Sequence, residues 1–370
     1  MNHKKGRQPV KKIRDYILKG EEIFVGLEDS KKTWNICVRS SRVIVHETRL
    51  PADYTNLCNY FHNQFPECKI RVMYEAGFRG FELHDKLVAD GWECIVTPPH
   101  TVTQEKCNKQ KNDTYDCRRL AKNNENNDYR ECHVPSRQRR EDRQVSRLCG
   151  QLQKDITRTC NRIRRTIEFH GLEQHFPTGS WSPRDYREAE KKLPTLAISD
   201  ELRFAFTTYF DTLTEARSRK LTAVRKLREI GSMPRYKRQI DILQSAPGIG
   251  RYTALRLALE WGDMGRFKTK QQFASFLGLI PSDYSSGEVE HKGHITKQGN
   301  RQVRASLIES SWVAIRYDQV LFEKYKTVLR SSGSAKKAIV AVARKLSMRL
   351  RAILLSGESY QIGLIECQKP

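Results

Sequence analysis

Long apolar runs are missing from this sequence of 370 residues. No stretch approaches the roughly 20 consecutive apolar residues that a helix needs to span a bilayer, which excludes an ordinary membrane-spanning protein. The first residues, MNHKKGRQPVKKIRDY, are basic and lack the apolar core of a secretory signal peptide. We therefore expect a cytoplasmic protein with no membrane partner.

Paired cysteines are also missing. The 10 cysteines are scattered along the chain, and none belongs to a CxxC pair. The sequence therefore indicates neither a zinc knuckle nor a disulfide framework. We expect the thiols to be reduced and mostly part of the core.

Negative charge is scarce relative to positive charge. The chain has 43 Asp and Glu against 67 Lys and Arg, which gives a formal net charge of +24. A field of this sign favours polyanions and steers them to the protein at salt-dependent rates. A ribosomal or membrane-surface protein would share this balance, but 370 residues indicate two or three domains rather than a small basic module.

A glycine-containing turn separates two helical patterns in the segment LQSAPGIGRYTALRLALEWGD, which begins at Leu243. Two short helices joined by the turn PGIG (247–250) are typical of a helix-hairpin-helix. Gly248 and Gly250 have no Cβ, so backbone N–H groups and the helix start near Arg251 can approach a phosphate closely. The turn therefore predicts contact with DNA or RNA.

A polar loop farther along holds Ser285 and Ser286, directly before Gly287. Taken alone, a loop serine before glycine is an ordinary turn residue. It becomes a nucleophile only where a base, a metal or a reactive phosphate is near. The residues that follow are mostly basic and suit phosphate neutralisation: Lys292, His294, Lys297, Asn300, Arg301 and Arg304.

Alternating strand and helix patterns fill the first 120 residues. Strands are expected over 23–30, 34–39, 42–47, 70–75 and 93–97, and helices over 53–65 and 78–90, with a further helix after them. The order βββαβαβ followed by a helix is that of the ribonuclease-H-like fold. We therefore expect a basic tail over 1–20 and an α/β domain over 21–128.

Acidic residues stand where that fold holds divalent metals. Glu28 lies in the first strand and Glu75 ends the fourth, while Asp113 and Asp116 are three residues apart on the expected helix and share one side of it. Carboxylates are natural ligands of Mg²⁺, and two such ions can stabilise the attacking and leaving oxygens of a phosphodiester displacement. Each acid alone would be an ordinary surface charge, but the four together predict a Mg²⁺ site.

The middle of the chain is expected to be a helical, coiled-coil region over 129–235. One apolar stripe recurs every three or four residues: Val145, Leu148, Leu152, Ile156, Cys160, Ile163 and Ile167. Arg158, Arg162 and Arg165 share another face, which is either a solvated back or a phosphate-binding surface.

A second long helix is expected after Ser199. Its apolar residues follow coiled-coil spacing: Leu202, Phe206, Tyr209, Leu213 and Ala216. Such a seam suits packing within the chain as well as dimerisation. We expect a mostly helical domain with the helix-hairpin-helix and the serine over 236–325, and a C-terminal helix over 326–370.

The order of these motifs resembles that of the DEDD transposases of bacterial insertion sequences, a family also described as bridge-RNA-guided recombinases. VGLEDSKK resembles the family's VGIDVSK, YEAG its E-A/T-G, and KNDTYDCRRLA its KTDxxDAxxLA. PGIGxxTA, GLIPxxxxSG, GNRQVR and AKKAIVAVARKL continue the match over nearly the whole chain. One departure is that the family's first acid is an aspartate, whereas Glu28 aligns with it here and Asp29 stands beside it.

The resemblance implies a RuvC-like N-terminal domain, a C-terminal transposase domain and a DNA recombination reaction. The family's serine precedes the glycine, which selects Ser286 over Ser285 as the nucleophile that attacks a DNA phosphodiester. The four acids, Glu28, Glu75, Asp113 and Asp116, would be catalytic through their Mg²⁺ and would meet the serine from another protomer. A guide RNA and a homo-oligomer, either dimer or tetramer, are also implied.

Two other classes of function fit the same residues. A metal-dependent nuclease would hydrolyse branched DNA with water and leave Ser286 structural. A nucleic-acid-binding protein descended from a transposase would keep its basic surfaces, while the longer side chain of Glu28 displaces the metal. Asp29 can replace Glu28 only if the strand shifts or bulges, because neighbouring strand residues point to opposite faces.

Overall fold

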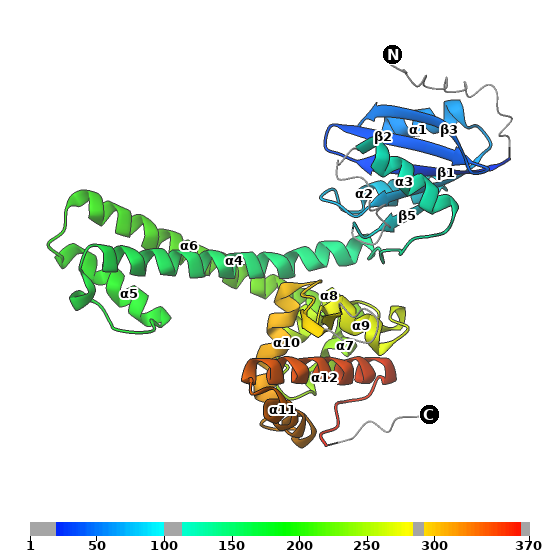
Figure 1. The fold of residues 1–370 in the computed structure, drawn as a ribbon. Coiled ribbons are helices and arrows are strands. Elements are labelled where there is room, and N and C mark those ends of the chain that lie inside the picture. Colours follow the sequence, from blue (N-terminus) through cyan, green and yellow to red (C-terminus); the bar gives the residue numbers. More distant parts are fainter. Residues whose placement is uncertain (1–19, 100–112, 284–291, 364–370) are drawn as a thin grey trace, which may run out of the picture. The chain divides into compact units, whose positions relative to one another are not determined.

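Five strands in the first part of the chain form one sheet (Figure 1). The computed structural model describes residues 20–99, 113–283 and 292–363. Its strands are β1 (Glu22–Asp29), β2 (Thr33–Ser40), β3 (Val43–Pro51), β4 (Lys69–Glu75) and β5 (Glu93–Thr97). In the order β3-β2-β1-β4-β5, the pairs β3·β2 and β2·β1 are antiparallel, whereas β1·β4 and β4·β5 are parallel. All five expected strands are present, and β3 runs a few residues farther than expected.

Helices cover both faces of this sheet. They are α1 (Tyr54–Gln64), α2 (Glu82–Ala89) and α3 (Asp113–Glu125). Leu57 of α1 and Leu87 of α2 share a core with Val25 of β1. On the other face, Leu120 of α3 packs with Met73 of β4. Because successive strand residues point to opposite faces, β1 and β4 each present alternate residues to α3.

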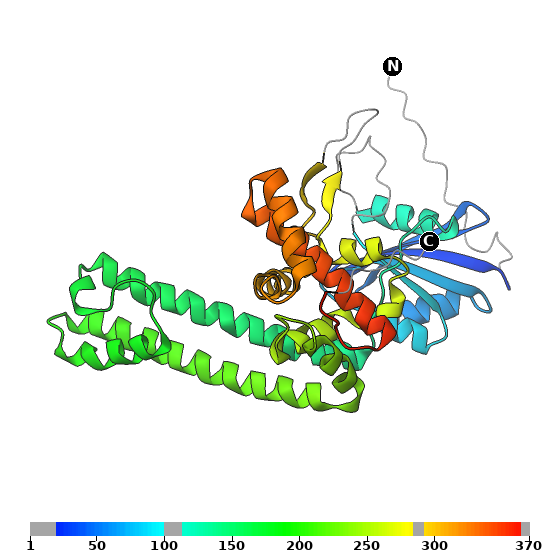
Figure 2. The ribbon, with the colours of Figure 1, turned by 90° about the horizontal axis from the view of Figure 1, so that it is seen from below.

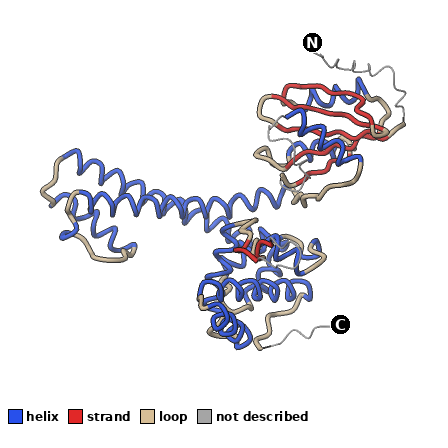
Figure 3. Tube along the Cα trace, in the orientation of Figure 1, coloured by secondary structure: helices blue, strands red, loops and turns tan. Residues whose placement is uncertain are grey.

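The chain divides into two units, Met1–Val134 and Pro135–Pro370. The first is the mixed α/β unit just described, with the element order that the sequence predicts. The second is mostly helical, as expected, and Figure 3 shows helix colouring over nearly all of it.

Two helices of 33 residues each dominate the start of the second unit. α4 (Arg137–Phe169) and α6 (Asp200–Ser232) lie side by side in Figures 1 and 2. Ser136 and Ser199 cap them by accepting hydrogen bonds from the backbone N–H groups of Arg139 and Leu202. The shorter α5 (Pro183–Lys192) packs into the same core through Tyr186 and Ala189.

The apolar stripe of α4 serves two cores, and the prediction of one continuous stripe is wrong at Leu148. Ile163 and Ile167 are buried in the core that α4 shares with α5 and α6. Val145 and Leu152 pack instead against the core of the C-terminal helices. Leu148 is 42% exposed, whereas the adjacent Cys149 is buried in that same C-terminal core. The seam of α6 packs inside the chain.

Helices and a small two-stranded sheet complete the second unit. They are α7 (Pro234–Gln244), α8 (Arg251–Trp261), α9 (Lys270–Leu277), β6 (Pro281–Asp283), β7 (Lys292–Ile295), α10 (Arg301–Ala314), α11 (Gln319–Ser332) and α12 (Ala335–Ser356). Short 3-10 helices lie at Glu173–His175, Leu193–Thr195 and Met264–Arg266. The core joins α12, through Val342 and Leu346, to α8, through Leu257 and Trp261.

The single C-terminal helix expected over 326–370 is instead two helices. Gly333 ends α11 in the left-handed conformation, with φ of 62°, which glycine adopts without strain. Ser334 then caps α12 by accepting from the N–H of Lys337. Among the described helices, none combines the length and apolar content needed to cross a membrane.

Candidate active site

Helix α3 lies directly on β1 at Gly26. A Cβ added at Gly26 would overlap the backbone of Cys117 and Ala121, so only glycine permits this approach. Farther along α3, the buried Asn124 donates its side-chain N–H to the carbonyl oxygens of Val25 (3.2 Å) and Arg71 (2.7 Å). These contacts fix the helix antiparallel to β1 and β4, with its first turns at the carboxyl ends of both strands.

Two of the predicted acids end these neighbouring strands on the side of α3. The parallel register pairs Leu27 with Tyr74, and Glu28 and Glu75 are the next residue on each strand. Glu28 follows Gly26 by two positions, and Glu75 follows Met73 by two. Because side chains alternate, both glutamates face the layer that contains α3.

A third acid joins them from the helix. The guanidinium of Arg119 lies 3.2 Å from Oε1 of Glu75 and 3.0 Å from Oδ1 of Asp116. The two carboxylates are therefore held on one cation, and their side chains are 23% and 20% exposed. The fold thus brings Glu28, Glu75 and Asp116 to one end of the sheet.

The donor set suits Mg²⁺, which prefers carboxylate oxygens. In the described part of the chain, no three His, Cys, Asp or Glu side chains are arranged to hold a metal ion, and Arg119 pairs with both Glu75 and Asp116. The side chain of Asp113, the fourth predicted acid, lies outside the described residues, although its backbone begins α3.

Asp29 serves the opposite face of the sheet. Its Oδ1 accepts from Trp34 Nε1 at 2.7 Å and lies 3.2 Å from Nε of Arg79. Burial raises the pKa of its carboxyl, and the contacts with Trp34 and Arg79 partly offset this. The register of β1 with β2 is regular through Glu28 and Asp29. Since β1 neither shifts nor bulges there, Asp29 does not take the place of Glu28.

The two glycines of the predicted helix-hairpin-helix turn differ in their surroundings. α7 and α8 are two short helices joined through PGIG, as expected. Gly248 has φ of 79°, and an added Cβ would overlap the carbonyl oxygen of Ser310 on α10. Its lack of a side chain therefore permits close packing rather than approach to a phosphate. Gly250 has open space around it, and next to it Arg251 is exposed and donates to Ser232 Oγ.

The predicted nucleophile Ser286, with Ser285, lies outside the described residues. The strands on either side of this loop are paired antiparallel, with Pro281 opposite Ile295 and Asp283 opposite Lys292. The side chain of Lys292 is also outside the described part.

The basic residues after the loop divide into surface and core. Lys297 and Arg301 are exposed. Arg304 is 8% exposed, and its Nη1 donates to the carbonyl oxygens of Leu277, Gln298 and Gly299. Burial lowers the pKa of Arg304, and the charge of Arg301 adds to this shift. Arg304 therefore stabilises the turn before α10, and its guanidinium is not presented to a phosphate.

The basic face expected on α4 is exposed. Arg158 pairs with Asp155 at 3.2 Å and Arg165 with Glu168 at 2.6 Å, each one turn away. Arg162 is exposed on the same side. These surface pairs are weak, so the arginines remain available to a polyanion.

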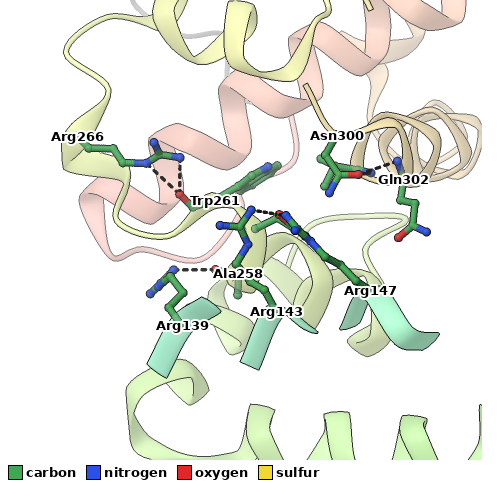
Figure 4. Close-up of polar contacts among 10 residues, drawn as sticks. Arg139, Arg143, Arg147, Ala258, Trp261, Arg266, Asn300 and Gln302 are labelled. Atoms are coloured by element: carbon green, nitrogen blue, oxygen red, sulfur yellow. Dashed lines mark hydrogen bonds and ion pairs between the residues drawn. The ribbon is translucent and has the colours of Figure 1, made fainter. Parts of the chain in front are cut away.

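Sequence reasoning missed a cluster of arginines on α4, which Figure 4 shows as Arg139, Arg143 and Arg147. Two of them pair with Glu260 of α8. Arg143 and Arg147 of α4 lie 2.6 and 3.1 Å from the carboxylate of Glu260, which is 5% exposed. Arg139, one turn earlier, donates to the carbonyl oxygen of Ala258 at 3.2 Å. The sequence contained a signal for this contact. The arginines recur every four residues on one helix face, and Glu260 is an acid in a mostly apolar stretch of another helix.

This cluster carries more positive than negative charge. Burial, with the charges of Arg143 and Arg139, lowers the pKa of Arg266 to about 10. Burial opposes ionisation of Glu260, but Arg147 and Arg143 outweigh it and hold the pKa of this carboxyl below its usual range. The cluster joins α4 to α8.

The sequence is also similar to those of known proteins. Residues 240–326 match the family described as "Transposase IS116/IS110/IS902 family". The chain is 25% identical over 275 residues to the transposase for insertion sequence element IS1111A of Coxiella burnetii, with 73% of each protein covered. It is 24% identical over 352 residues to the transposase for insertion sequence element IS1533 of Leptospira borgpetersenii, covering 89% of this chain and 94% of that one.

A shorter match, 29% identical over 119 residues, is to the pilin gene-inverting protein of Moraxella bovis, covering 32% of this chain and 37% of that one. The family match over residues 240–326 includes the turn between α7 and α8 and the two strands that flank Ser286. Residues 240–326 thus match the IS116/IS110/IS902 transposase family, and two insertion-sequence transposases are similar to this chain over most of its length.

Proposed function

We propose that this transposase cuts and rejoins DNA through an acidic Mg²⁺ site in the first unit and a serine nucleophile, Ser286, in the second. The observation that carries the proposal is the convergence of Glu28, Glu75 and Asp116 at the carboxyl ends of β1 and β4. Three carboxylates from three separate elements at one sheet end are a costly arrangement for folding alone, since like charges repel. We add Asp113, one turn before Asp116, as the fourth acid.

A ribonuclease-H-like fold for the first unit is part of this proposal. The order βββαβαβα, the sheet order β3-β2-β1-β4-β5 and the placement of α3 over β1 support it. The α7–α8 pair with its open Gly250 supports a helix-hairpin-helix that contacts the nucleic-acid backbone.

The chain's own groups have separate tasks in this reaction. The acids would hold Mg²⁺, which supplies charge stabilisation for the attacking and leaving oxygens of a phosphodiester when bound. Arg119 keeps Glu75 and Asp116 together and limits their repulsion. The Ser286 Oγ attacks the phosphorus and loses its proton, the P–O bond to the leaving DNA strand breaks, and that strand's oxygen takes up a proton. The phosphoserine conserves the ester for rejoining.

DNA is the substrate of this proposal, and a guide RNA and a second copy of the chain are its proposed partners. The net charge of +24 favours polyanions. The exposed residues that would contact them are Arg251, Lys297 and Arg301 within the matched domain, and Arg158, Arg162 and Arg165 on α4.

Glu75→Gln tests the acidic site. Glutamine keeps the size of the side chain and a contact with Arg119 but removes the charge that a metal needs. We expect DNA cleavage to fall by at least about 10²-fold, while DNA binding stays nearly unchanged because no phosphate contact is lost. Cleavage is measured with element-end DNA, Mg²⁺ and copurified RNA.

Glu22→Gln is the matched control. Glu22 begins β1, at the opposite end of the strand from Glu28, and forms a surface pair with Arg71 at 3.6 Å. It should leave cleavage intact. Full cleavage by Glu75→Gln would contradict the acidic site. Mg²⁺-dependent nicking without a protein–DNA adduct would favour a nuclease, and binding without either reaction would favour a binding protein.

A further inference from the structure

An exposed phenylalanine follows the acidic site directly. Phe78 comes three residues after Glu75 and is 72% exposed, more than any other large apolar side chain in the described part of the first unit. Phe81, in the same loop, packs against the core of the sheet. The loop therefore has an apolar position within reach of the core, yet it leaves Phe78 in water, where an aromatic ring gains nothing for stability.

The turn that presents Phe78 is held in place from within. The N–H of Gly80 donates to the carbonyl oxygen of Gly77 at 3.3 Å and closes a tight turn with Phe78 inside it. The hydroxyl of Tyr74, buried under the sheet, donates to the carbonyl oxygen of Gly80 at 3.4 Å. The backbone of the turn is therefore tied to β4, the strand that carries Glu75.

Arg79 fastens the other side of the turn to β1. Its Nε lies 3.2 Å from Asp29, its Nη2 donates to the carbonyl oxygen of Lys31 at 2.8 Å, and its guanidinium lies 5.6 Å from the ring centre of Trp34. Because Arg79 is fixed by these contacts, Phe78 is presented from a rigid support. Asp29 therefore helps to hold the turn in place through its ion pair with Arg79.

A second exposed aromatic residue flanks the acids from α3. Tyr115 precedes Asp116 and is 53% exposed. The guanidinium of Arg118, which pairs with Glu47 of β3, lies 5.8 Å from its ring centre. Phe78 and Tyr115, the exposed Phe and Tyr side chains in the described part of the first unit, thus each lie within three positions of a proposed catalytic acid.

We propose that Phe78 is a stacking contact for an unpaired DNA base beside the phosphodiester on which the acids act. This inference rests on the proposed function. An aromatic ring stacks on any base through its face, which makes the contact tolerant of sequence. A base inside a duplex is already stacked on its neighbours, so the ring selects bases that strand exchange or distortion has freed.

The test compares two duplexes that differ in one base. The full-length chain is titrated, by fluorescence anisotropy, with a labelled DNA duplex that is fully paired and with the same duplex carrying a single unpaired adenine. We expect the wild type to bind the bulged duplex more tightly than the paired one. In Phe78→Ala, the ratio of the two affinities should fall by on the order of 5- to 150-fold, the range of a single base stack. Phe78→Leu, which keeps an apolar side chain without a ring, should lose the preference too, and Phe78→Trp should keep it.

Val88→Ala is the matched control, because Val88 is another exposed apolar residue of this unit, 51% exposed on α2. It should bind both duplexes as the wild type does. A preference that persists in Phe78→Ala, or a wild type that binds both duplexes equally, overturns the stacking site while DNA binding stands. A wild type that binds neither duplex overturns the proposed function and the stacking site together.

Discussion

Glu260 is a carboxylate buried on an otherwise apolar helix, and at the scale of single residues it illustrates how this protein holds buried charge. Two arginines of α4 neutralise it. Asp29 and Arg304 follow the same rule, the first with Trp34 and Arg79 and the second with three backbone carbonyls. Each of these charged groups is matched by hydrogen bonds, as burial requires.

Glu260→Gln should make the second unit less stable at neutral pH. Removing one partner of a buried pair leaves Arg143 poorly compensated, a change that costs about 3 kcal/mol. The folded pKa of Glu260 lies below the ordinary value of 4.5, so its stabilisation is present above pH 4.5 and is lost as the pH falls through the folded pKa. The variant should therefore also lose less stability than the wild type on acidification.

Thermal unfolding of the full chain at neutral and acidic pH measures both effects. Glu229→Gln is the control, because Glu229 pairs with Lys226 on the surface and is 61% exposed. Such a pair contributes at most about 1 kcal/mol. Equal unfolding midpoints for Glu260→Gln and Glu229→Gln at neutral pH would show that the cluster does not join α4 to α8.

Residue types in the sequence indicated the acids but not their neighbours. Glu28, Glu75 and Asp116 could be placed because strand ends and a helix position follow from local patterns. Arg119 between the carboxylates could not, because its geometry depends on how closely α3 approaches the sheet at Gly26. The pairing of Arg147 with Glu260 joins residues 113 positions apart, and no local pattern records such a contact.

At the scale of elements, the strands were easier to predict than the partners of the long helices. The strands could be placed because each is a short run of apolar and β-branched residues bounded by turn residues. The stripe on α4 has the expected period and packs against two different cores, but Leu148 is exposed while the adjacent Cys149 is buried. The prediction of a single C-terminal helix was wrong because one residue, Gly333, ends α11.

Gly248→Ala and Gly250→Ala should separate packing from binding in the α7–α8 turn. Gly248 has positive φ and touches the backbone of α10, so alanine there should lower stability by about 1–3 kcal/mol. Gly250 has ordinary φ and free space, so alanine there should change stability by less than about 0.5 kcal/mol. If the turn contacts phosphate, Gly250→Ala should still weaken DNA binding.

Thermal unfolding and a DNA titration over several salt concentrations, performed on both variants, measure these two effects. A Gly248→Ala protein as stable as the wild type would contradict the packing role. A Gly250→Ala protein that binds DNA as tightly as the wild type at every salt concentration would remove the turn from the binding surface.

At the scale of the whole molecule, the two proposed catalytic groups belong to different units. The acids lie in the unit that ends at Val134, and Ser286 lies in the unit that follows. Each unit has its own core, so each can hold its part of the site in place independently. The proposed reaction therefore needs residues of both units.

In the proposed mechanism Ser286 forms a covalent bond to DNA, and a denaturing gel detects such a bond. The full chain is incubated with labelled element-end DNA, Mg²⁺ and copurified RNA. We predict a labelled band at the mass of protein plus DNA with the wild type and with Ser285→Ala, and no such band with Ser286→Ala, because the phosphoserine needs the Oγ. Recombination or an adduct at wild-type levels with Ser286→Ala would contradict the serine mechanism.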